Sequence, residues 1–261
     1  MLLSFPVIGV WQPGEVRVVW REQSSRKIVP EVEQIIDQTW QQAMSRPGVH
    51  LFDGPMCRLE SLLRTDHQLE LTLSPTSYKV FVGTNLTHAD LADVHGHQIL
   101  ANPIGLSTIL ISSDGWLMLG RRNSRVAYYP NRVHPFAGCL EPAENVDLFA
   151  DARRELREEL SLVSNEITEM ACTGITDDFT LRQPEVCFAA KSTPSAAQIE
   201  SRLDADEHAG VWKTSIERES IEAALDSDEV FTPVALGAML LWGRIQFGDA
   251  WFETHGPSGR R

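Results

Sequence analysis

Three glutamates near the middle of the chain are spaced so that they share one face of a helix. Glu155, Glu158 and Glu159 stand at positions i, i+3 and i+4, which are neighbours on a helical surface. Carboxylates this close repel one another unless protons or a cation neutralise them. Oxygen ligands with room left for water suit Mg²⁺, which often takes its remaining contacts from substrate phosphates. The spacing therefore predicts a magnesium site, with Mn²⁺ as a second candidate, that acts on a phosphate-containing substrate.

The same segment also has a simpler interpretation. Arg153, Arg154 and Arg157 lie among the glutamates, so the segment could be a solvated helical face held by ion pairs one turn apart. The context favours the metal site, because Gly138 and a loop precede the helix and a strand-rich segment follows it. The opposite stripe of the helix is apolar and suited to packing against a sheet: Leu148, Ala152, Leu156 and Leu160.

Composition narrows the class of protein. The 261 residues are 43% apolar and 23% charged, as in a soluble globular protein. A formal charge of −13 disfavours nucleic-acid binding, because a phosphate backbone rewards a basic face. No stretch is apolar for long enough to span a bilayer. Four separated cysteines and the lack of a signal-peptide pattern indicate a reducing cytosol. We expect a cytoplasmic protein that binds a small molecule, with no nucleic-acid, membrane or protein partner.

The elements that position the glutamates follow from periodicity and turn signals. Helices are predicted over 30–44, 146–161, 195–203 and 233–246. Strands are predicted over 16–20, 58–63, 69–73, 106–112, 116–120, 167–175, 185–190 and 210–214. Asp114-Gly115 indicates a hairpin, whereas Thr193-Pro194 and Thr232-Pro233 indicate helix starts. These elements predict an α/β (α+β) protein with a mixed sheet flanked by helices.

We expect three parts along the chain. Residues 1–100 form an N-terminal α+β extension, residues 101–250 the catalytic domain, and residues 251–261 an unordered tail rich in Gly, Pro and basic residues.

The segment from Gly138 to Leu162 resembles the Nudix box. In that pattern Gly, five residues, Glu, seven residues and Arg-Glu-U-X-Glu-Glu-X-Gly-U follow one another, with U aliphatic. The matching residues are Gly138, Glu144, Arg154, Glu155, Leu156, Glu158, Glu159 and Leu162. The chain departs from the pattern twice, with nine residues between Glu144 and Arg154 and with Ser161 in place of the late glycine. The resemblance implies a Nudix α/β/α sandwich in which Glu155 and Glu159 are the principal metal ligands and Glu158 assists.

Strings outside the box are similar to those of mammalian Nudix pyrophosphatases of UDP-glucose and UDP-galactose. They cover 51–55, 58–61, 76–85, 102–105 and 138–142. This resemblance implies hydrolysis of a UDP-sugar to UMP and a sugar 1-phosphate, with the N-terminal extension covering the substrate cleft. It implies substrate contacts at Phe52, Tyr78, Arg122, Ala127, His134 and Glu141. A carboxylate from a later loop, Glu207, is the candidate for the catalytic base.

Simpler alternatives remain open for several of these residues. Phe52 and Tyr78 could pack within the extension, and Glu141 and Glu207 could be solvated surface acids. The substrate could also be ADP-ribose or coenzyme A, and the chain could be a nucleotide-sugar-binding module that has lost catalysis. Loss of Glu155 or Glu159 would indicate such a module, and both residues are present.

Overall fold

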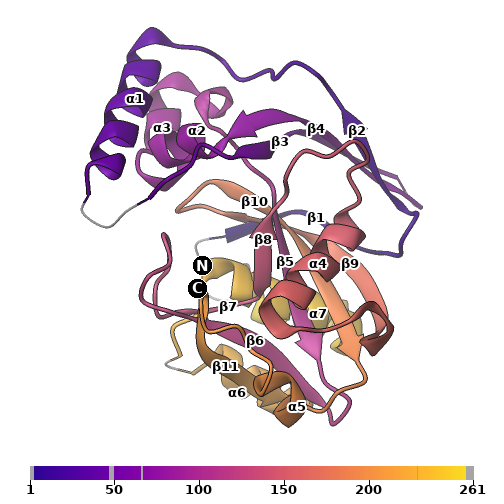
Figure 1. Cartoon of the computed structure of the whole chain (residues 1–261). Coiled ribbons are helices and arrows are strands. Elements are labelled where there is room, and N and C mark those ends of the chain that lie inside the picture. Colours follow the sequence, from indigo (N-terminus) through magenta and orange to yellow (C-terminus); the bar gives the residue numbers. More distant parts are fainter. Residues whose placement is uncertain (1–2, 47–49, 66, 228, 257–261) are drawn as a thin grey trace.

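The computed structural model describes residues 3–46, 50–65, 67–227 and 229–256. Figure 1 shows a small N-terminal layer lying over a larger sandwich. The large sheet of the sandwich contains β1 (Leu3–Trp11), β9 (Ile167–Asp178), β10 (Gln183–Ser192), β5 (Gly105–Ile111), β6 (Trp116–Arg122) and β11 (His208–Ser215), in that order. Two short strands extend it, β7 (Val133–His134) beside β6 and β8 (Phe136–Cys139) beside β5. Only β5 and β10 run parallel, so the sheet is mixed, as expected.

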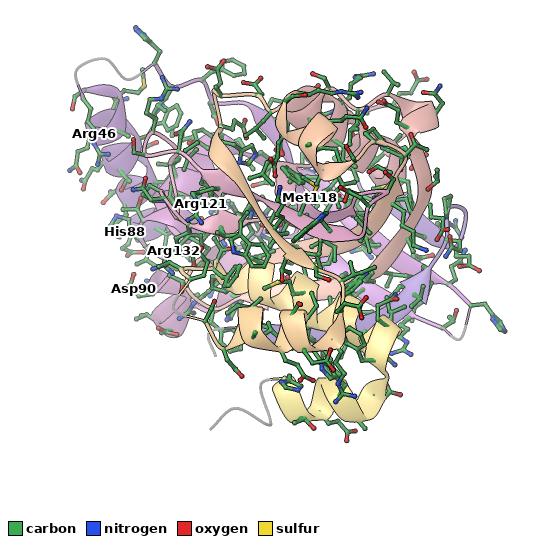
Figure 2. All side chains as sticks on the ribbon, turned by 90° about the horizontal axis from the view of Figure 1, so that it is seen from below. Arg46, His88, Asp90, Met118, Arg121 and Arg132 are labelled. Carbon is green, nitrogen blue, oxygen red and sulfur yellow. The ribbon has the colours of Figure 1, made fainter. Side chains whose placement is uncertain are left out.

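Two helices cover opposite faces of this sheet. Helix α4 (Leu148–Leu160) packs in one hydrophobic core, and α7 (Pro233–Phe247) packs in another on the far side. The shorter helices are α5 (Ala196–Glu200), α6 (Arg218–Leu225) and α8 (Asp249–His255), with a 3-10 turn η3 (Ser164–Glu166). The result is the α/β/α sandwich that the sequence predicts, and Met118 lies in its interior (Figure 2).

The N-terminal layer is built on a three-stranded sheet. Its strands are β2 (Val16–Trp20), β4 (Leu69–Ser77) and β3 (Pro55–Arg64), in that order. The helical side contains α1 (Pro30–Met44), α2 (Tyr78–Phe81), α3 (Leu91–His95) and the short turns η1 (Val82–Leu86) and η2 (His97–Ile99). Helix α1 buries Val32, Ile36 and Trp40, the apolar stripe from which the helix is predicted.

Helix α4 forms where the sequence predicts it. Asp147 caps its start, because the side chain accepts hydrogen bonds from the backbone N–H groups of Phe149 (2.9 Å) and Ala150 (3.1 Å). The apolar stripe is buried against the sheet, and each buried leucine contributes roughly 1.5–3 kcal/mol. The helix ends at Ser161, whose φ of 53° is left-handed. Glycine is the usual residue in that conformation, so Ser161 takes the backbone shape of the glycine it replaces.

The helix start predicted at Thr193-Pro194 is wrong, because Ser195 is the N-cap and α5 begins at Ala196. The start predicted at Thr232-Pro233 is confirmed. Thr232 caps α7 by accepting a hydrogen bond from the backbone N–H of Ala235 at 3.1 Å, and Pro233 occupies the first turn. Asp114 and Gly115 form the turn between β5 and β6, where Gly115 has a φ of 81°. Both signals are local in sequence, which is why they are readable without the fold.

The structure differs from the expected division of the chain at both ends. Strand β1 pairs with β9 in the large sheet, so the first part of the 1–100 extension belongs to the sandwich. Residues 249–255 form α8, so most of the described tail is helical, whereas residues 257–261 lie outside the described residues. Trp251 of α8 is buried among the aromatic residues of the α7 core. Tertiary burial therefore orders a segment that has little helical signal of its own.

The N-terminal layer is attached to the sandwich by backbone hydrogen bonds. The N–H of Cys57 donates to the carbonyl of Leu140, and the N–H of Ile104 donates to the carbonyl of Cys57, each at 2.9 Å. Further along the seam, the Asn85 amide donates to the carbonyls of Leu181 (2.9 Å) and Arg182 (3.0 Å). These bonds fix the layer beside the end of the sheet where α4 presents its glutamates.

The four cysteines are free thiols, as expected. Within the described ranges, no helix is long and apolar enough to cross a membrane.

Candidate active site

Two of the α4 glutamates are withdrawn from solvent and the third is not. Glu155 packs against the backbone of β8 at Gly138, where an added Cβ would overlap its carboxylate. The glycine that opens the Nudix-like segment is therefore required for this approach. Glu159 is only 5% exposed, whereas the side chain of Glu158 is 52% exposed.

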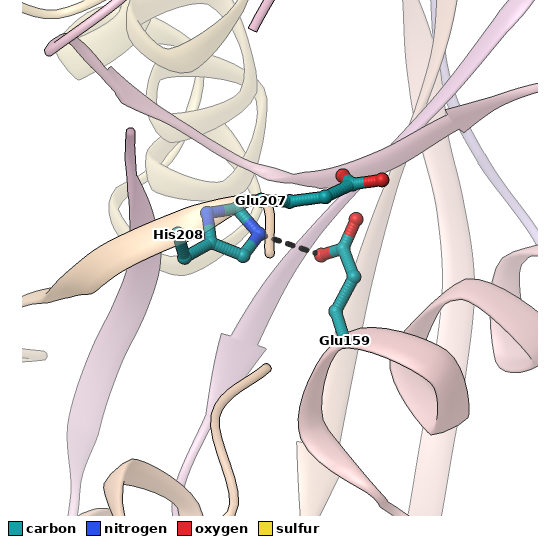
Figure 3. A group of neighbouring side chains, drawn as sticks. All are labelled: Glu159, Glu207 and His208. Carbon is teal, nitrogen blue, oxygen red and sulfur yellow. Dashed lines mark hydrogen bonds and ion pairs between the residues drawn. The ribbon is translucent and has the colours of Figure 1, made fainter. Parts of the chain in front are cut away.

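The carboxylate of Glu159 is held by two donors, one on each oxygen. The backbone N–H of Ala137 donates to Oε1 at 3.1 Å, and His208 Nε2 lies 3.1 Å from Oε2 (Figure 3). A ligand atom of Glu207 lies within 4.8 Å of those of Glu159 and His208. The structure thus brings Glu207, which directly precedes β11, next to a carboxylate 48 positions earlier in the chain.

The electrostatics of the site reflect burial and mutual repulsion. Burial raises the pKa of Glu155 to about 7, opposed by Arg154 and reinforced by the charges of Glu159, Glu158 and Glu207. Burial also raises the pKa of Glu159, opposed by the hydrogen bond and charge of His208. Arg154 pairs with Glu155 (2.7 Å) and Glu158 (2.8 Å). The simpler interpretation of α4, a solvated face held by ion pairs, is therefore correct for Arg154 and the two glutamates it pairs with. It does not describe Glu159, which is buried.

The donor set fits a hard divalent cation. The site offers carboxylate oxygens from Glu155, Glu158, Glu159 and Glu207, and the charges of the last three raise the pKa of Glu155. An added positive charge would relieve this repulsion. A divalent cation held there would polarise a phosphoryl oxygen and stabilise developing negative charge.

A hollow of about 280 Å³ opens next to Gly138, because it is lined by Cys139, whose pKa is raised by burial and also by the charge of nearby Glu155. It is lined by residues from both the N-terminal layer and the sandwich: Phe52, Gly54, Pro55, Met56, Tyr78, Phe81, Tyr128, Cys139 and Glu141. Three predicted substrate contacts, Phe52, Tyr78 and Glu141, therefore meet in one place. Larger hollows of about 640 Å³ and 420 Å³ exist, but neither is lined by a predicted substrate contact.

Phe52 and Tyr78 differ in whether packing within the N-terminal layer explains their position. Phe52 is 78% exposed at the rim of the hollow, so packing does not explain it. Tyr78 is half-buried and makes an edge contact with Trp40, with ring centroids 6.1 Å apart, while also lining the hollow. Tyr78 therefore has a packing role in addition to any contact with a ligand.

Arg122 lies against Tyr128, which lines the hollow, and opposite His208 in the pairing of β6 with β11. It is 8% exposed, its Nε donates to the carbonyl of Tyr128 at 3.2 Å, and its guanidinium lies 4.6 Å from the Tyr128 ring centroid. Among the described residues no carboxylate forms an ion pair with it. Arg121, which faces the other way, pairs with Glu229 at 2.8 Å. A buried guanidinium without an acidic partner is suited to a phosphate.

A fully buried carboxylate lies near Arg122. Glu185 of β10 accepts a hydrogen bond from the Ser107 hydroxyl at 2.5 Å, and its carboxylate occupies the space above Gly105. Burial raises the pKa of Glu185 to about 7.

The remaining predicted residues do not line the hollow. His134 is 1% exposed and shares a hydrogen bond of 2.8 Å with the Thr232 hydroxyl, and burial beside Arg122 and His208 lowers its pKa. Ala127 lies exposed in the loop between β6 and β7, next to Tyr128. Glu144 is exposed in the loop before α4. Substrate contacts at His134 and Ala127 stay predictions.

Two residues of the site were not identified from the sequence. His208 follows a charged run that reads as solvated surface, and Tyr128 lies in an irregular loop. Neither residue stands at a sequence spacing that would relate it to the glutamates. Strand β11 and the loop between β6 and β7 come near α4 only because the strands pair in the sheet. The adjacency of Glu207 and His208 was the one local hint.

No known protein-family profile matches the sequence. A solved Nudix hydrolase from Nitrosomonas europaea is similar with a TM-score of 0.38 and 16% identity, over 54% of this chain and 87% of that one. Among curated proteins, the uridine diphosphate glucose pyrophosphatase NUDT22 of Homo sapiens is 23% identical over 286 residues, covering 94% of this chain and 92% of the human protein. The Mus musculus protein of the same name is 24% identical over 94% of this chain and 90% of its own length.

The similarity to these pyrophosphatases thus extends over the N-terminal layer as well as the sandwich. The glutamates of α4 and the glycine of β8 match the Nudix-like pattern; Glu155 lies against Gly138, and Glu159 clusters with Glu207 and His208. The chain is therefore similar to the Nudix pyrophosphatases over nearly its whole length.

Proposed function

We propose that this Nudix-type enzyme hydrolyses the diphosphate of UDP-sugars, UDP-glucose and UDP-galactose, to UMP and a sugar 1-phosphate. The reaction depends on Mg²⁺, for which Mn²⁺ can substitute. The observation that carries the proposal is that Arg122 lies opposite His208 of the carboxylate cluster and against Tyr128 of the aromatic hollow. A nucleotide sugar has matching parts, since its diphosphate needs cations and its base needs an aromatic wall.

Each part of the site has a role in this proposal. Glu155 and Glu159 hold the cation with help from Glu158, and the cation supplies the Lewis-acid chemistry. Arg122 binds a phosphate or ribose oxygen, and Phe52 and Tyr78 stack on the uracil while Glu141 accepts hydroxyl hydrogen bonds at the rim. Glu207, exposed beside Glu159, accepts the proton of the attacking water. The free thiols agree with a reducing compartment such as the cytoplasm.

The test is a substrate panel with metal-free protein. UDP-glucose, UDP-galactose, ADP-ribose and coenzyme A are each incubated with excess EDTA, with Mg²⁺ and with Mn²⁺. UMP and sugar 1-phosphate are then separated by ion-exchange chromatography. We expect the highest kcat/KM for the UDP-sugars and turnover only with a divalent cation.

Two outcomes would overturn parts of the proposal. A higher kcat/KM for ADP-ribose or coenzyme A would keep the chemistry and reject the uridine specificity. Tight binding of UDP-glucose without turnover, under any of the metal conditions, would instead indicate a binding module.

A further inference from the structure

His208 approaches Glu159 with only one of its two ring nitrogens. Nε2 lies 3.1 Å from Glu159 Oε2, and Nδ1 is buried without a hydrogen-bond partner in the protein. A carboxylate accepts hydrogen bonds, so Nε2 is the donor in this contact. In Figure 3 the ring points its Nε2 edge at Glu159, with Glu207 beside both.

The ring is fixed on its other sides. An added Cβ at Gly120, on the neighbouring strand β6, would overlap the ring at Cε1 and Nδ1. Phe136 of β8 packs edge-on against it, with ring centroids 5.6 Å apart and planes at 78°. The imidazole is 3% exposed. Its orientation is therefore set by β6, β8 and α4 together.

We propose that His208 is a positioning residue that orients the Glu159 carboxylate for the divalent cation and is not itself a metal ligand. With the Ala137 N–H on Oε1 and His208 on Oε2, both oxygens are held while each keeps lone pairs for a cation. Nε2 is occupied by this hydrogen bond, and Nδ1 is enclosed by Gly120. The inference rests on the proposed function, because Glu159 is the carboxylate assigned to the cation there.

Residues that hold a metal ligand in place typically change metal affinity by about 10–100-fold when replaced. His208→Leu should weaken the binding of Mg²⁺ and of Mn²⁺ by a similar factor in that range. His208→Gln, whose amide nitrogen reaches close to the position of Nε2, should restore most of the loss. Gly120→Ala keeps the histidine but displaces its ring, so it should behave like His208→Leu.

The measurement is titration calorimetry of Mg²⁺, Mn²⁺ and Zn²⁺ into metal-free protein without nucleotide, with a thermal melt of each variant. His88→Leu is the control, since His88 bonds Thr39 at 3.0 Å in the N-terminal layer, where Figure 2 labels it, and should leave all three affinities unchanged. Because no nucleotide is used, the result is independent of UDP-sugar hydrolysis. If hydrolysis failed and these shifts appeared, only the proposed function would be rejected.

The proposal fails if folded His208→Leu binds Mg²⁺ as tightly as the parent. It also fails if His208→Gln loses Zn²⁺ affinity far more than Mg²⁺ affinity, because imidazole is the better ligand for Zn²⁺ and that selectivity would make His208 a ligand. Should Gly120→Ala not fold, the His208→Leu and His208→Gln pair still decides between these outcomes.

Discussion

Glu158 and Glu159 are adjacent on α4, yet their surroundings give them unequal roles. Glu159 is buried with a donor on each oxygen, whereas Glu158 is half in solvent and pairs with Arg154. A carboxylate that is already held in place loses little conformational freedom when a cation binds and when the transition state forms.

Glu159→Gln should therefore lower kcat at least about 100-fold, because it removes a metal ligand that acts in the transition state. Glu158→Gln should have a clearly smaller effect. Steady-state kinetics with UDP-glucose at saturating Mg²⁺ measures both, and the thermal melt confirms folding. Equal losses in the two variants would contradict the ranking that burial predicts.

Arg122→Ala should lower the affinity for UDP-glucose by about 1.5–3 kcal/mol, as expected for a lost charge-assisted hydrogen bond. Arg121→Ala is the matched control, because its guanidinium is engaged by Glu229 on the far side of the strand. Titration calorimetry with Ca²⁺ in place of Mg²⁺ gives both affinities without turnover. An equal loss of affinity for Arg121→Ala would mean that the net charge of the protein, and not the position of the Arg122 guanidinium, determines binding.

Glu185 should make the metal-free protein less stable as pH rises. Its folded pKa of about 7 lies above the ordinary 4.5, so the native state holds the extra proton between those values. Stability is therefore lost as pH rises through this window, and the full loss above pH 7 is on the order of 3 kcal/mol.

Urea unfolding in EDTA at about pH 5 and pH 8 tests this difference for the parent and Glu185→Gln. The variant removes the titration but keeps an acceptor for Ser107, so its stability should fall less between the two pH values. Glu169→Gln, an exposed glutamate on β9 whose side chain is 67% exposed, should keep the parental difference. The same fall in Glu185→Gln as in the parent would rule out Glu185 as the source.

At the scale of elements, α4 shows how local signals and packing combine. Asp147 starts the helix and the apolar stripe holds it on the sheet, while Glu155 and Glu159 lie beside that stripe and face β8. The one strained position is its end, where Ser161 has a left-handed backbone that costs a non-glycine residue about 1–2 kcal/mol.

Ser161→Gly should relieve this strain and raise Tm by about 2–3 °C, since glycine's greater freedom in the unfolded chain offsets part of the gain. Ser164→Gly is the control: Ser164 is also exposed but does not have a positive φ, so its Tm should stay the same or fall. Scanning calorimetry measures both. A lower Tm for Ser161→Gly would show that the serine stabilises the helix end in another way.

At the scale of the whole molecule, the two layers complete one hollow. Phe52 and Tyr78 come from the N-terminal layer and Tyr128 and Cys139 from the sandwich. The backbone bonds of Cys57 and the amide of Asn85 keep these walls together. Specificity for the nucleoside would thus depend on the attachment of the layer.

Phe52→Ala should weaken binding of UDP-glucose by about 1–3 kcal/mol through lost stacking, without lowering Tm, because the ring is 78% exposed. Phe179→Ala removes another exposed ring, 51% accessible at the β9–β10 turn, and should leave affinity unchanged. Tyr78→Ala should lower both affinity and Tm, because Tyr78 also packs on Trp40. Unchanged affinity in Phe52→Ala would remove the N-terminal layer from base recognition.

The sequence by itself determined what depends on short-range order. The spacing of Glu155, Glu158 and Glu159, the cap at Thr232 and the Asp114-Gly115 turn are local patterns, and the helices and hairpin appear where these patterns predict them. The sandwich class follows from the order of such elements.

Tertiary structure alone decided what depends on distant segments meeting. No periodicity relates His208 to Glu159, because their contact depends on the register of β11 on β6 and on the missing side chain of Gly120. The same holds for β1, which joins the large sheet only by pairing with β9 more than 150 residues later, and for α8, whose order comes from burial of Trp251. Such contacts are selected by the free energy of packing the whole chain, which no local window of sequence contains.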